Sequence, residues 1–283
     1  ADCNSIYPAS IETSIKRIIV FNTESAVLQI LLITPPPHYS STDPSIILHP
    51  SITPHPLRNT SNPHPPPQTT MPTWLITGAN RGLGLEFVTQ LSKDASNTII
   101  ATSRSMTPST LAGLEALAIK PRLHILECDL SSPTSITALG EQVTGLLDGD
   151  SSKIDFVLNN AGVNVASQET GLTISPEAIL ANVQTNVVGP AMIVQVLEKH
   201  LGKGGVVMNM TSGLGSMDDT RKTEVTKCAP YSISKAGVNM LTLHQASHLR
   251  ERGVVVVCVD PGVSTLSEEV EVGCLLMCNV VVG

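Results

Sequence analysis

Short apolar runs alternate with longer amphipathic segments between Thr73 and Val259. The runs are rich in β-branched residues and leucine, as strands covered on both faces are, and they predict strands at Thr73–Thr77, Thr98–Thr102, Arg122–Glu127, Ile154–Leu158, Gly205–Met210 and Gly253–Val259. The amphipathic segments predict helices at about Gly82–Lys93, Ser109–Ala118, Pro133–Leu147, Pro176–His200 and Cys228–Arg250. We therefore expect an α/β fold with a doubly wound parallel sheet, a Rossmann-like three-layer αβα arrangement that binds ligands at the carboxyl ends of its strands.

The first 70 residues differ in composition from the rest of the chain. Proline runs at 35–37 and 65–67 stand among serine, threonine and histidine, and such a segment buries too little apolar surface to fold. Few basic residues and no Arg-rich amphipathic pattern disfavour a transit peptide. We interpret residues 1–70 as a low-complexity extension, disordered or non-native, and expect the functional polypeptide to start at Met71. The folded domain is then expected over 71–262, followed by an atypical tail over 263–283.

Composition narrows the class of partner. The chain carries 24 acidic and 17 basic residues, for a formal net charge of −7, and has no long basic run. This disfavours nucleic acid, and an aromatic content of 2% disfavours stacking on single strands. No uninterrupted apolar stretch reaches the roughly 20 residues of a membrane span. We expect a small-molecule substrate as partner, with no nucleic acid and no membrane.

Cysteine usage suggests the compartment. The six cysteines lie far apart or in apolar runs, without the spacing of a zinc site or a disulfide framework. They predict reduced thiols and a cytoplasmic protein. His244 and His248 share a helical face at metal-compatible spacing, but the sequence offers them no carboxylate or cysteine partner, so we expect no metal.

A glycine-rich loop follows the first predicted strand and opens the first predicted helix. It reads Thr77-Gly78-Ala79-Asn80-Arg81-Gly82-Leu83-Gly84. Glycines in this place allow a tight turn, let the backbone approach a pyrophosphate, and aim a helix N-terminus at the negative charge. Glycines that serve only the turn remain an alternative. No Gly-Lys-Ser/Thr ends the loop, which disfavours a P-loop phosphotransferase.

The end of the second strand bears on the choice of cofactor. No acidic residue stands where one would bind the ribose hydroxyls of NAD. The strand ends instead in Thr102-Ser103-Arg104, and a guanidinium beside a small hydroxyl residue can hold the 2′-phosphate of NADP. Arg81 adds a second cation. Each arginine alone could be a solvated surface charge, but together they favour NADP(H).

Tyr231 and Lys235 are one helical turn apart near the start of the last predicted helix, so they share a face. A free phenol, with a pKa near 10, is a poor acid–base catalyst at neutral pH. A neighbouring ammonium is expected to lower that pKa and let the phenol exchange a proton with a carbonyl or alcohol oxygen. Taken alone, the pattern Tyr-x-x-x-Lys often occurs by chance on helix surfaces and does not by itself indicate catalysis.

Ordered motifs from Met71 to Gly262 resemble the short-chain dehydrogenase/reductase family. They are Thr77-Gly78-x-x-x-Gly82-x-Gly84, Asp129-Leu130, Asn159-Asn160-Ala161-Gly162, Asn186 within Thr185–Pro190, Thr211-Ser212-Gly213-Leu214-Gly215 and Tyr231-x-x-x-Lys235. The long polar loop Gly213–Pro230 is similar to that of the NADP-dependent carbonyl reductase branch. The resemblance implies an oxidoreductase that transfers a hydride between NADP(H) and a ketone, aldehyde or alcohol.

The resemblance also implies roles for single residues. Ser212 would hydrogen-bond the substrate carbonyl oxygen, which Tyr231 would protonate. Lys235 would hold the nicotinamide ribose, Asn186 would anchor a water linking Lys235 to solvent, and Asp129 would bind adenine. Any one of these polar residues could instead serve a turn. The implied cofactor-binding residues are Gly78, Asn80, Arg81, Gly82, Leu83, Gly84, Arg104, Asp129, Leu130, Asn159, Asn160, Ala161, Gly162, Tyr231, Lys235, Pro261, Gly262, Val263 and Thr265.

The match departs from the family after Asp260-Pro261-Gly262. Val263 and Thr265 each arrive one place early for the turn that touches the nicotinamide carboxamide, and only about twenty residues follow where the family has substrate-covering helices and a seventh strand. We therefore expect these parts to be missing and turnover to be weak or absent; a gene-model error at Val263 is an alternative. A non-catalytic NADP(H) sensor is the rival function, whereas an epimerase or dehydratase would need a larger substrate domain. The family pairs subunits through helices like Pro176–His200 and Cys228–Arg250, which implies a homodimer or homotetramer.

Overall fold

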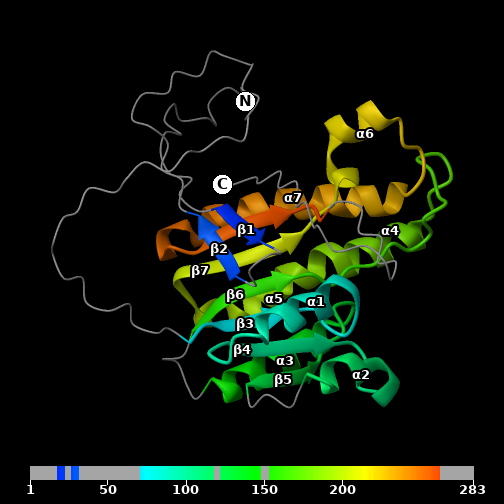
Figure 1. The fold of residues 1–283 in the computed structure, drawn as a ribbon. Coiled ribbons are helices and arrows are strands. Elements are labelled where there is room, and N and C mark those ends of the chain that lie inside the picture. Colours follow the sequence, from blue (N-terminus) through cyan, green and yellow to red (C-terminus); the bar gives the residue numbers. More distant parts are fainter. Residues whose placement is uncertain (1–17, 23–26, 32–70, 118–121, 148–152, 262–283) are drawn as a thin grey trace, which may run out of the picture. The chain divides into compact units, whose positions relative to one another are not determined.

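A six-stranded parallel sheet forms the centre of the domain (Figure 1). The computed structural model describes residues 18–22, 27–31, 71–117, 122–147 and 153–261. The strands stand in the order β5-β4-β3-β6-β7-β8, all parallel. Their bounds are β3 Thr73–Ile76, β4 Thr98–Ser103, β5 Leu123–Glu127, β6 Ile154–Asn159, β7 Leu201–Met210 and β8 Val255–Val259. The predicted doubly wound α/β fold is confirmed, with the first strand of the sheet at its centre and the chain order reversing between β3 and β6.

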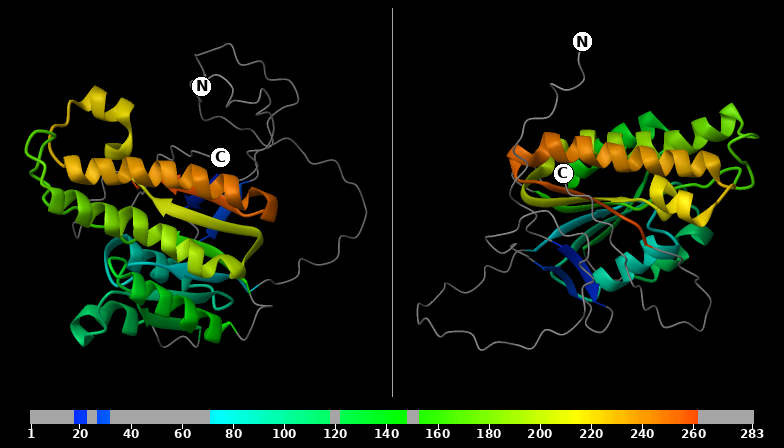
Figure 2. Two further views of the ribbon diagram at one scale, coloured as in Figure 1. Left: turned by 180° about the vertical axis from the view of Figure 1, so that it is seen from behind. Right: turned by 90° about the horizontal axis from the view of Figure 1, so that it is seen from above.

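Helices cover both faces of the sheet. One core packs the sheet against α3 (Pro133–Leu146), α5 (Gly189–Leu197) and α7 (Ala229–Leu249). The other core packs it against α1 (Gly82–Leu91) and α2 (Pro108–Glu115). In the reversed view of Figure 2, α5 and the orange α7 lie in front of the sheet. The three layers follow from the right-handed crossovers between parallel strands.

Strand β3 shows why its residues form a central strand. All four of its side chains are buried, and they alternate between the two cores, with Leu75 on one side and Trp74 and Ile76 on the other. Trp74 stacks on Phe156 of the neighbouring β6, with ring centroids 3.8 Å apart. A strand covered on both faces favours apolar side chains on both sides, which Trp74, Leu75 and Ile76 supply.

The predicted helix Pro176–His200 is continuous but not uniform. It consists of α4 (Pro176–Val183), a π-helical turn η2 (Gln184–Val188), α5 and a 3-10 turn, Glu198–His200. Among the described residues this run is the one segment that is long and apolar enough to cross a membrane by length and composition. Its residues Ile193, Val194 and Leu197 are buried in the core beside α3, as those of a core helix are.

The structure adds elements that the sequence pattern did not predict. Helix α6 (Met217–Thr223) lies between β7 and α7, and β7 begins at Leu201 rather than Gly205. Within residues 1–70 the described part consists of β1 (Ile18–Asn22) and β2 (Val27–Leu31), which form a two-stranded sheet. The predicted absence of a last strand and of substrate-covering helices concerns residues 262–283, which lie outside the described residues. It therefore stays a prediction, as do the domain bounds.

Candidate active site

The glycine loop after β3 is held by the loop after β6. The Asn160 side-chain amide donates to the carbonyl oxygens of Thr77 (3.0 Å) and Gly78 (3.2 Å). The backbone N–H of Ala161 donates to Thr77 Oγ1 at 3.1 Å. Two motifs that lie far apart in the sequence therefore meet at the carboxyl edge of β3 and β6, where the strand order reverses.

Two glycines of this loop sit where no other residue fits. Gly78 has φ +65° and approaches Ala161 so closely that a Cβ would lie 2.8 Å from the Ala161 Cβ. A Cβ on Gly84 would overlap the carbonyl oxygen of Gly78. The turn and the first turn of α1 therefore form one close-packed unit.

The N-terminus of α1 is open to a ligand. Its N-cap is Arg81, and no side chain caps the first turn, so its orphan backbone N–H groups can bind an anion. Asn80, Gly82 and Leu83 are half-exposed along this turn. A close-packed glycine cradle that ends in an uncapped helix N-terminus fits the pyrophosphate of a dinucleotide.

Arg81 and Arg104 are both exposed, and neither forms an ion pair with any residue in the described part of the chain. Ser103 is buried, and its hydroxyl donates to the carbonyl oxygen of Ser105 at 2.8 Å. At the end of β4, the side chain of Arg104 is therefore exposed to solvent, whereas that of Ser103 is buried.

Asp129 and Leu130 follow β5 and play different parts. The Asp129 carboxylate accepts from the backbone N–H (2.9 Å) and hydroxyl (2.7 Å) of Ser131, which closes the turn. Leu130 is buried in the core, and a Cβ on Gly189 would lie 2.8 Å from its own Cβ. Any cofactor contact by Leu130 would thus come from its backbone.

Ser212, Tyr231 and Lys235 come together from β7 and α7. Tyr231 and Lys235 stand on the first turns of α7, and the Lys235 ammonium lies 5.5 Å from the centre of the Tyr231 ring. Lys235 is buried and donates to the carbonyl oxygen of Met210, the last residue of β7, at 2.6 Å. Ser212 is near enough to Tyr231 for its hydroxyl to affect the phenol by hydrogen bonding.

Asn239 fixes the loop that carries Ser212. The Thr211 hydroxyl donates to Asn239 Oδ1 at 2.6 Å, and the Asn239 amide donates to the carbonyl oxygen of Gly215 at 3.1 Å. Gly215 packs directly on the helix, since a Cβ there would lie 2.7 Å from the carbonyl carbon of Lys235. The serine loop is therefore clamped to the helix that carries Tyr231 and Lys235.

Asn186 lies in the π-helical turn η2 and uses its whole side chain in the fold. Its Oδ1 accepts from the Val163 N–H at 2.8 Å, and its amide donates to the Val163 carbonyl oxygen (2.8 Å) and to Ser234 Oγ (2.9 Å). A Cβ on Gly162 would lie 3.2 Å from Asn186 Oδ1 and 3.5 Å from the Lys235 ammonium. Asn186 and Lys235 thus flank Gly162, and the Asn186 side chain holds the loop after β6. The water that Asn186 is expected to anchor stays a prediction.

Asn159 points into the protein. It is buried and its amide donates to Asn209 Oδ1 on β7 at 2.9 Å. Asn209 in turn donates to Thr242 (3.0 Å) and Gln245 (2.9 Å) on α7. The first asparagine of the Asn-Asn-Ala-Gly motif therefore ties two strands to a helix, and the second holds the glycine loop.

The pKa values of the two central groups move in directions set mainly by burial. Burial raises the pKa of Tyr231; hydrogen bonding by Ser212 opposes this, and the charges of Asp260 and Cys228 add to it. Burial lowers the pKa of Lys235 to about 8, against the opposing effect of Asp260. The sequence predicted a lowered pKa for the phenol; the direction is opposite because loss of water outweighs other influences in the protein alone.

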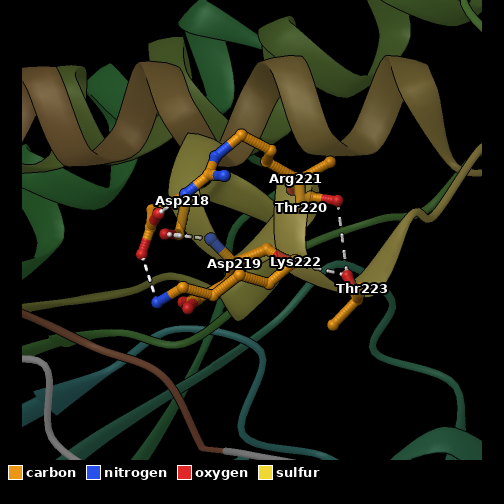
Figure 3. Close-up of polar contacts among 7 residues, drawn as sticks. Asp218, Asp219, Thr220, Arg221, Lys222 and Thr223 are labelled. Atoms are coloured by element: carbon orange, nitrogen blue, oxygen red, sulfur yellow. Dashed lines mark hydrogen bonds and ion pairs between the residues drawn. The ribbon is translucent and has the colours of Figure 1, made fainter.

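Helix α6 lies between Ser212 and Tyr231 in the chain, and charged side chains within this helix pair with one another (Figure 3). Asp218 pairs with Arg221 at 2.8 Å and with Lys222 at 2.5 Å. Hydrogen bonds from Lys222 and Arg221 lower the pKa of the Asp218 carboxyl. Ser216 caps the helix by accepting from the Asp219 N–H at 3.2 Å. These charges are therefore engaged within the helix rather than aimed at Tyr231.

Three residues at the site had been given no role by the sequence: Asp260, Asn239 and Ser234. Asp260 follows β8 directly and acts on both Tyr231 and Lys235; its position after a predicted strand was the signal available. Asn239, one turn after Lys235, could have been found by extending the helical face. Of the predicted residues, Pro261 lies at the end of the described chain, and Gly262, Val263 and Thr265 lie outside it.

Comparison with known proteins decides the family. The model of the short chain dehydrogenase family matches residues 72–270. The chain belongs to this family. The short-chain dehydrogenase/reductase atnB of Arthrinium sp is 30% identical over 202 residues, which cover 68% of this chain and 74% of the relative. AacuF of Aspergillus aculeatus, also a short-chain dehydrogenase/reductase, is 31% identical over 202 residues, with the same coverage.

Solved structures agree with the family. The NADPH-bound carbonyl reductase from chicken fatty liver superposes with a TM-score of 0.62 at 29% identity, covering 67% of this chain and 78% of the other. As a short-chain dehydrogenase, the protein is an oxidoreductase of the NAD(P)-dependent kind that acts on CH–OH groups. No group of three or more potential metal-ligating side chains occurs among the described residues.

Proposed function

We propose that this short-chain dehydrogenase reduces the carbonyl group of a ketone or aldehyde with NADPH, or oxidises the matching alcohol. The observation that carries the proposal is the convergence of Ser212, Tyr231 and Lys235 at the carboxyl edge of the sheet, clamped together through Asn239. The same edge holds the glycine cradle, so a dinucleotide bound there would extend toward these side chains.

The bound cofactor would supply the hydride that adds to the carbonyl carbon. Ser212 would donate a hydrogen bond to the carbonyl oxygen, which gains negative charge as the carbon is reduced. Tyr231 would pass its proton to that oxygen and complete the alcohol. A raised phenol pKa keeps this proton in place at neutral pH, as reduction requires. Lys235 has a pKa of about 8, which is close to neutral pH, so it could supply a new proton to Tyr231 after the phenol has given its own to the substrate.

A preference for the phosphorylated cofactor is supported by charge. Arg104 directly follows β4 and is exposed, and Arg81, the N-cap residue of α1 in the glycine loop, is exposed as well. No acidic residue occupies the position that would bind an unphosphorylated ribose. The chicken carbonyl reductase, a relative of similar fold, binds NADPH.

We further propose a cytoplasmic location and a homodimer or homotetramer as the working state, without nucleic acid or membrane partners. The spacing of the six cysteines, which resembles neither a zinc site nor a disulfide framework, supports the location. Exposed apolar side chains on α4 and α7 support self-association: Leu180 is 68%, Ile233 48% and Met240 57% exposed. Size-exclusion chromatography with light scattering tests the oligomer.

The function is tested by NADPH oxidation against a panel of ketones and aldehydes. We expect weak turnover by the full chain, and a loss of more than about a hundredfold in Tyr231→Phe with a much smaller effect on NADPH affinity. Thr223→Val on α6 provides a control that should keep full activity. NADPH binding without turnover of any carbonyl in the wild type would favour a cofactor sensor instead.

A further inference from the structure

We propose that the carboxylate of Asp260 is a positioning group of this site, which keeps Lys235 charged and sets the pH range in which Tyr231 carries its proton. The inference rests on the proposed function for its role in catalysis. Asp260, the Ser212 loop and the Lys235 ammonium meet at one pair of strand ends, and the charge of Asp260 acts on both Lys235 and Tyr231.

Strand pairing places Asp260 next to the Ser212 loop. In the register of the sheet, Met210 of β7 stands beside Val259 of β8. The pairing continues one residue further, since the Thr211 N–H donates to the carbonyl oxygen of Val259 at 2.8 Å. Asp260 therefore leaves its strand at the level where the other strand turns into Ser212.

The carboxylate reaches across to that loop. A Cβ on Gly213 would lie 3.2 Å from Asp260 Oδ2, which is tighter than ordinary contact. The glycine after Ser212 thus leaves room for the carboxylate. Lys235 approaches the same strand ends from the helix side, because its ammonium binds the carbonyl oxygen of Met210 at 2.6 Å. A carboxylate and an ammonium thereby flank one pair of neighbouring strand ends.

The negative charge of Asp260 raises the pKa of both Lys235 and Tyr231. For Lys235 this effect opposes that of burial. The other titratable group that acts on the phenol is Cys228, at the start of α7. A buried amine is otherwise prone to lose its proton. In this arrangement the carboxylate offsets part of that cost, so the ammonium persists at neutral pH.

The sign of the effect follows from coupling between the phenol and the amine. Both lose a proton as pH rises, and a negative neighbour raises the proton affinity of each, so removing it lowers both apparent pKa values of the pair. Carbonyl reduction needs the protonated pair. Loss of the Asp260 charge should therefore move the alkaline fall of the reduction rate to lower pH.

The test compares Asp260→Asn with two companions. Asp260→Glu keeps the charge, and Glu251→Gln removes one charge from an exposed residue just before β8, at the opposite end of the same strand. We expect the alkaline limb of kcat for carbonyl reduction to move down by roughly half a pH unit in Asp260→Asn. Asp260→Glu and Glu251→Gln should keep the wild-type profile. An unmoved limb in a folded Asp260→Asn variant, or an equal shift in Glu251→Gln, would overturn the inference.

A second readout needs neither substrate nor cofactor. The chain has three tyrosines, so the difference in near-ultraviolet phenolate absorbance between wild type and Tyr231→Phe isolates the titration of Tyr231. We expect that titration to occur at lower pH in Asp260→Asn than in the wild type. A shift here in a protein that reduces no carbonyl would sink the proposed function and keep the electrostatic role. An unchanged titration would sink that role and leave the proposed function standing.

Discussion

Asn239 accepts the hydroxyl of Thr211 at 2.6 Å while donating its own amide to the next turn of the same loop. This bond ties the residue before Ser212 to the helix that carries Tyr231. Asn239 therefore helps to hold the serine hydroxyl at a fixed distance from the phenol.

Removing this clamp should lower the rate of the chemical step. In Asn239→Ala we expect kcat to fall about tenfold, because Ser212 loses its fixed position relative to Tyr231, with little change in NADPH affinity. His244→Ala, on an exposed position of the same helix, is the control. Steady-state kinetics with cofactor binding by fluorescence separate the effects, and a kcat that matches the control would refute the clamp.

The close-packed glycine turn predicts opposite results for two Gly→Ala changes. Gly84→Ala would force a methyl group against the Gly78 carbonyl oxygen, so NADPH affinity should fall at least tenfold and stability with it. Gly145→Ala in α3 has no atom within 4 Å of the new Cβ. It should stabilise the protein by about 1 kcal/mol through helix propensity. Denaturant titration and NADPH binding of both variants measure this, and equal effects would contradict the packing argument.

Arg104 should govern the choice between NADPH and NADH. In Arg104→Ala we expect NADPH affinity to fall roughly tenfold to a hundredfold, because the guanidinium loses its contact with the 2′-phosphate, while NADH affinity changes little. Arg250→Ala, an exposed arginine at the end of α7, controls for total charge. Isothermal titration with both cofactors gives the ratio. A parallel loss of NADH affinity would place the effect elsewhere.

Burial of Lys235 predicts a pH-dependent cost in stability. Its pKa falls from 10.5 when unfolded to about 8 in the native protein, so the unfolded chain binds more protons between these values and stability rises with pH across them. Below about pH 8 the buried ammonium costs about 3 kcal/mol. Lys235→Met should therefore be more stable than wild type near pH 7, with the difference shrinking toward pH 10. Urea unfolding at several pH values measures it; a constant difference would contradict the assignment.

Arg252 joins the far ends of two elements. Its guanidinium donates to Glu198 Oε1 (2.8 Å) and to the carbonyl oxygens of Glu198 (2.7 Å) and Leu201 (2.7 Å). Arg252→Ala should cost about 2 kcal/mol because the three hydrogen bonds of the guanidinium are lost, and Arg252→Lys should recover only part of this. Thermal unfolding checks the order of the three proteins. Activity per folded molecule should stay unchanged, since the site lies at the opposite edge of the sheet.

The sheet and its ligand edge could be predicted from the sequence because they follow local signals. Continuous β-branched runs predicted the strands. Polar residues directly after those runs predicted which side chains lie at the carboxyl ends of the strands, where the ligand binds. Helix α6 could not be predicted this way. Its sequence Met217–Thr223 has no apolar periodicity, and it is held by the Ser216 cap and by charges that pair within it.

Other features depend on contacts between distant residues. The direction of the Tyr231 pKa is set by burial, which arises only when the chain folds. The roles of Asn159 and Asn186 depend on partners on other elements, Asn209 and Val163. A motif therefore indicated where these residues would lie but not which way their side chains would face.

The wide turn at Gln184–Val188 lets one continuous helix serve two different neighbours. Helix α4 before it packs against α7, and α5 after it packs against α3. An added residue in one turn rotates all that follows by about 100° relative to a regular helix. Deleting one residue there would swing Ile193 and Leu197 out of the core. The number of residues between α4 and α5 is therefore constrained by the packing of both helices.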